Sequence, residues 1–135
     1  MSDLDVQQAL SLRYRTSLEA DNYTDQMRQS LGLDTKAQVA RLAIGRSLAM
    51  GKLPEGAVDS QGKDIPAMSL FSPENIGAWV GLLVSHSLTS GGTAIDSMES
   101  LRTSIRAHWH RGAVALWGDW LSADQKNTGT VATSR

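Results

Sequence analysis

The chain has no cysteine among its 135 residues. This absence excludes disulfide bonds, thiolate catalysis and zinc sites with cysteine ligands, and it is typical of proteins from a reducing compartment. Charge of one sign is missing as well, because 13 lysines and arginines face 14 aspartates and glutamates and give a formal net charge of −1. Any binding of nucleic acid must therefore depend on local basic patches.

Long apolar runs are also absent. The longest nearly uncharged stretch, Ile76–Leu88, includes Ser85 and His86 and is shorter than the about 20 residues that a membrane-spanning helix needs. The acidic N-terminal residues lack the basic and apolar segments of a signal peptide. We therefore expect a cytoplasmic protein without a membrane segment, and the length favours a single domain.

The sequence contains none of the common catalytic motifs, such as Gly-x-Ser-x-Gly, a Gly-rich phosphate loop or His-Glu-x-x-His. His108 and His110 stand two residues apart, which on a helix directs the two rings about 200° apart and prevents them from sharing a metal ion. His86, on an apolar segment, is more typical of a hydrogen-bonded core histidine. We expect no catalytic residue, no metal, no cofactor and no enzymatic activity.

Residues 10–17 alternate between apolar and polar side chains, which predicts a half-buried strand with Ser11, Arg13, Arg15 and Ser17 facing outward. A capping pattern from Thr16 to Glu19 begins a helix that Gly32 ends. Asp34, with a further box from Thr35 to Gln38, begins a second helix that stops at residues 50–51. This order over residues 10–50 is that of a ribbon-helix-helix unit, in which two copies pair their strands.

The second half of the chain is expected to be helical. Residues 52–71 are rich in turn-forming residues and predict a loop without a helix. Ser72, Pro73 and Glu74 begin a helix over 73–89, where Gly77 and Gly81 and the apolar residues all round predict close packing on several sides. A last helix over 96–121 carries one apolar stripe, made by Met98, Leu101, Ile105, Trp109, Gly112, Leu116 and Trp120.

These elements predict a mainly α fold: a ribbon-helix-helix-like unit of one short strand and two helices, followed by two longer packed helices. The domain covers residues 1–121, with its later helical part over 72–121, and a polar, disordered tail follows over 122–135. Three of the four tryptophans lie on the last helix, which favours a core or subunit interface over base stacking. The apolar second and third helices predict a homo-oligomer.

Two local basic regions are candidates for binding DNA phosphates. Residues 35–52 carry four basic residues and no acidic one, and Arg102 and Arg106 stand at i, i+4 spacing on the last helix. The full set of predicted DNA-binding residues is Arg13, Arg15, Lys36, Arg102, Arg106 and Arg111. Solvated surface is the alternative interpretation, as is pairing of the last-helix arginines with Asp96 or Glu99.

Three segments resemble the DndE family, the small subunit of bacterial DNA sulfur-modification (phosphorothioation) systems. They are Leu31–Ala49, Asp59–Gly62 and Leu101–Ala113, the last with an Arg-Ala-His-x-x-Arg-Gly core. The resemblance covers roughly residues 10–121. It implies a helical oligomer, tetrameric in the family, that binds duplex or nicked DNA beside the sulfur-inserting proteins and has no chemistry of its own. With four lysines, the chain has fewer than the family pattern.

The leading hypothesis is a non-enzymatic, oligomeric DNA-binding accessory subunit of a DNA sulfur-modification system. A ribbon-helix-helix transcription regulator or antitoxin-like protein is one alternative, although residues 1–50 would suffice for it. A scaffold that docks partner proteins without touching DNA is the other. Sequence-specific operator binding would favour the regulator, and indifference to DNA at low salt would favour the scaffold.

Overall fold

A computed structural model of the chain describes residues 4–57, 59–92 and 94–133. The elements follow the order α1 (Val6–Leu10), β1 (Arg13–Tyr14), α2 (Leu18–Leu31), α3 (Lys36–Leu48), β2 (Ile65–Pro66), α4 (Ala67–Leu70), α5 (Ile76–Thr89) and α6 (Met98–Thr133). The expected class is confirmed: a short N-terminal strand and two helices are followed by longer packed helices. Among the described residues, no helix has the length and apolarity to cross a membrane.

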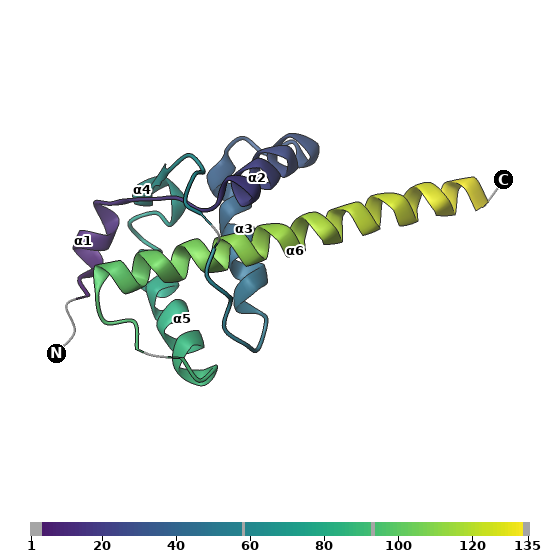
Figure 1. Cartoon of the computed structure of the whole chain (residues 1–135). Coiled ribbons are helices and arrows are strands. Elements are labelled where there is room, and N and C mark those ends of the chain that lie inside the picture. The colour runs from purple at the N-terminus through teal and green to yellow at the C-terminus, as the bar shows by residue number, and fades with distance from the viewer. Residues whose placement is uncertain (1–3, 58, 93, 134–135) are drawn as a thin grey trace.

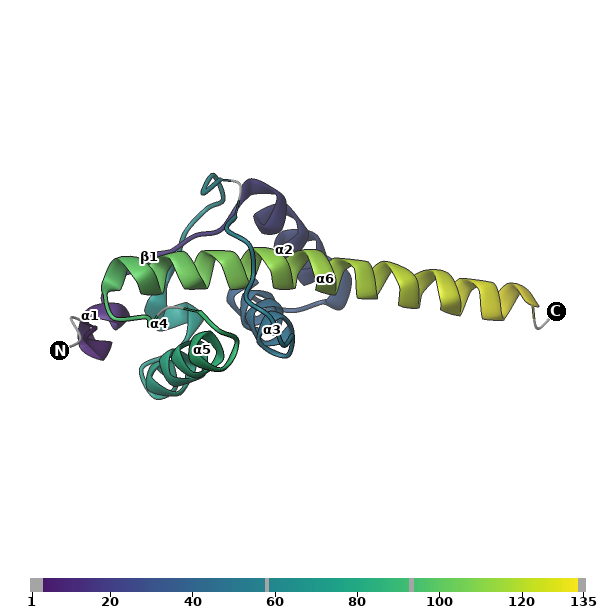
Figure 2. The same ribbon diagram turned by 60° about the horizontal axis from the view of Figure 1, so that its bottom comes forward.

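Helix α6 is the axis of the fold. Helices α2 and α3 pack along its middle, while α1 and α5 lie near its beginning (Figure 1). The contact with α3 is especially close at Gly112, where a Cβ atom would lie 1.6 Å from the carbonyl oxygen of Ala43. The C-terminal part of α6 projects away from the rest of the molecule in both views (Figures 1 and 2).

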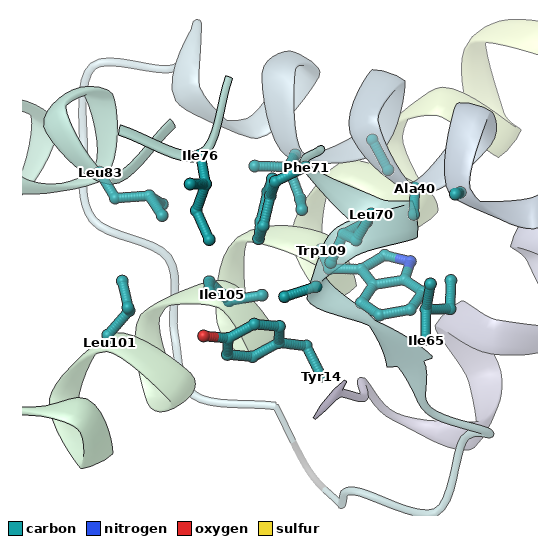
Figure 3. Close-up of a cluster of buried hydrophobic side chains, with 14 of the residues drawn as sticks. Tyr14, Ala40, Ile65, Leu70, Phe71, Ile76, Leu83, Leu101, Ile105 and Trp109 are labelled. Carbon is teal, nitrogen blue, oxygen red and sulfur yellow. The ribbon is translucent and has the colours of Figure 1, made fainter. Parts of the chain in front are cut away.

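The core gathers around Trp109, whose side chain is fully buried (Figure 3). Its indole N–H donates to Oγ1 of Thr24 at 3.1 Å, so the ring is fixed in orientation as well as buried. Tyr14 enters the same core and its hydroxyl donates to the carbonyl oxygen of Ala9 at 2.9 Å. The core interpretation of Trp109 is confirmed.

Local capping signals predicted the ends of α2 and α3 well. Gly32 ends α2 with φ of 68°, a left-handed conformation that glycine adopts without steric cost. The capping box of Thr35 and Gln38 is confirmed, although Thr35 rather than Asp34 is the N-cap. At the start of α2 the N-cap is Ser17, not Thr16, because the Thr16 hydroxyl donates instead to the carbonyl oxygen of Arg106 at 3.1 Å.

The predicted strand over residues 10–17 is much shorter in the structure. Helix α1 extends to Leu10, and the two-residue β2 offers pairing only to Arg13 and Tyr14. The partner of β1 is therefore the antiparallel β2 of the same chain, where the ribbon-helix-helix plan predicts a strand from a second copy. Residues 52–71, expected to form a loop without a helix, contain both β2 and the single turn of α4.

Helix α5 begins three residues later than predicted and buries only one face. Ser72 has φ of 66° and residues 73–75 form a turn, so α5 begins at Ile76. An added Cβ at Gly77 or Gly81 would meet nothing within 4 Å, so the close packing expected there is absent within the described part of the chain.

Helix α6 continues to Thr133, and its predicted end near Leu121 is wrong. Residues 122–133, expected to belong to a disordered tail, continue the helix, and they contain no proline that would break it. The last two residues of that predicted tail lie outside the described part of the chain.

Candidate anion-binding site between the strand pair and the last helix

A cavity of about 470 Å³ lies between β1, the residues that precede β2, and the first half of α6. Figure 2 shows β1 running alongside α6, and the two elements contact each other. The residues that line the cavity are Ser11, Leu12, Arg13, Tyr14, Arg15, Ser60, Asp64, Arg102 and Arg106. Four of the six predicted DNA-binding residues therefore meet at one place.

Strand β1 and the residue that follows it direct Arg13 and Arg15 to the same side of the chain. Successive side chains of a strand alternate in direction, so Tyr14 points into the core while the two arginines point outward. Their side chains are 56% and 50% exposed, which leaves both guanidinium groups accessible to a ligand. Ser17, predicted to face outward with them, is instead buried where it caps α2.

Helix α6 supplies Arg102 and Arg106, which stand one turn apart on its surface. The hydrogen bond from Thr16 to the carbonyl oxygen of Arg106 fastens the end of the strand segment to this turn. The Nε atom of Arg106 is buried and has no hydrogen-bond partner among the described residues. Among the residues that the structure describes, neither Arg102 nor Arg106 forms an ion pair with Glu99.

Tyr14 and Arg102 both line the cavity. Burial raises the pKa of Tyr14 to about 12, and the positive charge of Arg102 opposes this shift. The phenol is therefore neutral at physiological pH.

Asp64 is the acidic group that lines the same cavity. Its Oδ1 accepts from Nε of Arg13 at 2.8 Å, and its Oδ2 accepts from Nη2 of Arg15 at 3.4 Å. The hydrogen bond from Arg13 is the main cause that holds the pKa of Asp64 below its usual value. No local spacing in the sequence points to Asp64, because it lies 51 and 49 positions away from Arg13 and Arg15.

The chain before Asp64 is anchored onto the start of α2. The Asp59 carboxylate accepts from the backbone N–H groups of Gln61 and Leu18, each at 2.9 Å, and these bonds lower the pKa of Asp59. The N–H of Gly62 donates to the carbonyl oxygen of Thr16 at 3.0 Å. A Cβ atom at Gly62 would lie 2.9 Å from that oxygen, so the close approach requires glycine.

The other two predicted DNA-binding residues lie outside the cavity. Lys36 forms an ion pair with Asp21, and the capping box of α3 already occupies part of the helix start that was predicted to hold a phosphate. Arg111 donates to the side chain and the backbone of Ser47, both at 2.8 Å, and to the carbonyl oxygen of Lys52 at 2.7 Å. Arg111 therefore stabilises the C-terminal end of α3.

The three histidines have internal partners. His86 is buried and its Nε2 lies 2.7 Å from the carbonyl oxygen of Met50, so the core interpretation is confirmed. His108 and His110 contact different serines, Ser47 at 2.8 Å and Ser17 at 2.5 Å. Within the described residues, no group of three or more histidine, aspartate or glutamate side chains is placed to hold a metal ion.

The chemistry that this cavity offers is recognition of an anion. Guanidinium groups donate several hydrogen bonds in a planar fork that suits phosphate oxygens, and four such groups line the cavity beside one carboxylate. In comparisons with protein-family models and with curated proteins, the chain matches none. Membership of the DndE family therefore stays a prediction from the three similar segments.

Proposed function

We propose that the protein is a non-enzymatic DNA-binding subunit that holds phosphates of the DNA backbone in the four-arginine cavity. The observation that supports this most is the convergence of Arg13 from β1 and Arg15 directly after it with Arg102 and Arg106 from α6. The segment around β1 and helix α6 are far apart in the sequence, yet the fold brings their arginines to one cavity. Charge patterning within either segment does not explain this convergence.

Phosphates are a better ligand for this cavity than base edges. A ribbon that reads bases in the major groove presents a row of side chains from two paired strands. Here β1 has two residues, its partner is β2, and Arg13 and Arg15 share a cavity with α6. Contacts from such a cluster neutralise phosphate charge and carry no sequence information directly.

The resemblance to DndE extends the proposal to a biological setting. In that setting the subunit is a homo-oligomer, a tetramer in the family, that holds duplex or nicked DNA beside the proteins that insert sulfur into the backbone. We expect no nuclease, ATPase or sulfur-transfer activity from the purified protein alone. Metal-dependent cleavage that persists through purification and disappears in His108→Ala or His110→Ala would contradict this.

The test of the proposal is a salt titration of binding to a fluorescein-labelled duplex, intact or nicked. Each of Arg13→Ala, Arg15→Ala, Arg102→Ala and Arg106→Ala should weaken binding similarly on every sequence. Each should also make the slope of log K against log salt concentration shallower, by about one for each phosphate contact that is lost. The reason is that a phosphate without its guanidinium partner no longer releases a counterion.

Arg28→Ala is the matched control. Arg28 lies on α2, pairs with Asp25 and is not part of the cavity, so its removal should leave the salt slope unchanged. If the four cavity variants bind like the control, the cavity does not hold DNA. A loss confined to particular base pairs, of about 1–3 kcal/mol each, would favour the regulator instead, and no binding by the native protein would favour the scaffold.

A further inference from the structure

Asp64 lines the cavity and binds two of its four arginines. Its two carboxylate oxygens bind two different arginines, as two oxygens of one phosphate would. Its side chain lines the cavity and is 28% exposed, so it lies among the arginines rather than behind them.

The position of Asp64 follows from the strand register. Arg13 faces Pro66 and Tyr14 faces Ile65, so continuing the register by one residue places Asp64 across from Arg15. Opposed residues of an antiparallel pair share a face of the sheet, which is here the face of both arginines. The anchored chain at Asp59 and Gly62 holds the backbone of this segment in place.

We propose that Asp64 is an internal competitor that phosphate must displace from Arg13 and Arg15. The inference rests on the proposed function and adds a regulatory group to the same cavity. With Asp64 in place, Arg13 and Arg15 are partly neutralised, while Arg102 and Arg106 keep a separate approach to the ligand from α6. Native affinity for DNA is thereby reduced, and tight binding requires that the carboxylate leave the guanidinium groups.

The competitor role makes a distinctive prediction about salt. A phosphate that displaces a carboxylate releases fewer counterions than one that binds free arginines. Asp64→Asn, which keeps the size of the side chain and removes its charge, should therefore bind the duplex about three- to tenfold more tightly at low salt and show a steeper salt slope. Asp64→Ala should behave in the same way, and agreement between the two variants would show that the effect does not come from the new asparagine side chain.

Two controls separate this role from others. Glu74→Gln removes one negative charge from an exposed residue that does not line the cavity, and it should change neither affinity nor slope by a comparable amount. In the Arg13→Ala, Arg15→Ala background, Asp64→Asn should lose its effect, because neither guanidinium that Asp64 binds remains to be released. Thermal unfolding of each variant verifies that the fold is kept.

The outcomes distinguish the inference from the proposed function. If the native protein binds through the arginines but Asp64→Asn and Asp64→Ala bind equally or more weakly, Asp64 positions the arginines and the competitor role is overturned. If neither the native protein nor the Asp64 variants bind duplex, the proposed function fails and the inference fails with it. Binding that is gained only in the Asp64 variants would support the competition between Asp64 and phosphate but would overturn the proposed function, because the native protein would then not hold DNA.

Discussion

At the residue scale, His108 is held neutral by its surroundings. Burial is the main cause that lowers its pKa from the usual 6.5 to about 4, and the nearby His86 and Arg111 add to the shift. The rings of His86 and His108 meet edge to face with centroids 4.8 Å apart. A proton on His108 would therefore be buried close to other positive or protonatable groups.

This environment predicts how stability changes with pH. Between pH 6.5 and about 4 the unfolded chain binds a proton at His108 that the folded protein does not, so the free energy of unfolding falls as pH falls through that window. The contribution of this one group is about 3 kcal/mol. Urea unfolding at the two ends of the window measures it. His108→Asn keeps an acceptor for the Ser47 hydroxyl but cannot take up a proton in this pH range. If the free energy of unfolding of this variant falls between pH 6.5 and 4 as much as that of the native protein, the prediction is contradicted.

Sequence patterns predicted which residues carry the charge of the cavity but not what they contact. Alternation along the strand correctly assigned Arg13 and Arg15 to the outward side, and helical spacing placed Arg102 and Arg106 together. The same patterns gave no sign that Lys36 and Arg111 have partners on other elements. Such partners depend on tertiary packing, which periodicity in one element does not encode.

At the scale of elements, the crossing of α3 and α6 depends on Gly112. Gly112→Ala would press a methyl group against the carbonyl group and Cα of Ala43. These are backbone atoms, which cannot move aside as the end of a flexible side chain can. We expect this variant to lose about 3 kcal/mol of stability or more. Thermal or urea unfolding is the measurement, and a stability equal to that of the native protein would show that the helices can separate at little cost.

Gly118→Ala is the matched control on the same helix. An added Cβ there would meet nothing within 4 Å. Because alanine is the better helix former, this variant should gain up to about 1 kcal/mol. Opposite signs for the same substitution at two positions of α6 would assign the cost at Gly112 to the close approach and not to helix propensity.

The elements that sequence analysis predicted well are those whose ends are set by neighbouring residues. Gly32 and the box of Thr35 and Gln38 act within one turn, so their signals are visible in the sequence. Strand β2 and helix α4 were missed because they exist through contacts with distant segments. The N–H of Ala67, for example, donates to the carbonyl oxygen of Leu12 at 2.9 Å.

At the scale of the whole molecule, the outer side of α5 is a largely apolar surface without a partner among the described residues. Leu82 and Leu88 are 53% and 58% exposed, and they share the exposed arc of the helix with the small residues Gly77, Ala78 and Gly81 and with the polar residues Ser85 and Thr89. Figure 2 shows α5 at the edge of the molecule. A surface with two exposed leucines and several small residues is typical of a protein interface.

We therefore expect a homo-oligomer whose interface includes this side of α5. Replacing both Leu82 and Leu88 with glutamate would place charges within the interface and should lower the mass measured by light scattering to that of a monomer. Leu18→Glu is the control, because Leu18 is 50% exposed but lies at the start of α2. A native protein that is monomeric at micromolar concentration would contradict the prediction before any variant is made.

Under the proposed function, oligomerisation would strengthen DNA binding by a protein of nearly neutral charge. Each copy offers one four-arginine cavity, and linked copies bind a second phosphate group at a high effective concentration. The monomeric variant should therefore lose at least about tenfold in affinity for a long duplex while its affinity for pyrophosphate, which occupies one cavity, stays unchanged. Titrating both ligands into the native protein and the variant separates the two effects. Equal losses for both would mean that the glutamates damage the cavity itself, and an unchanged affinity for duplex would mean that a single cavity carries the binding.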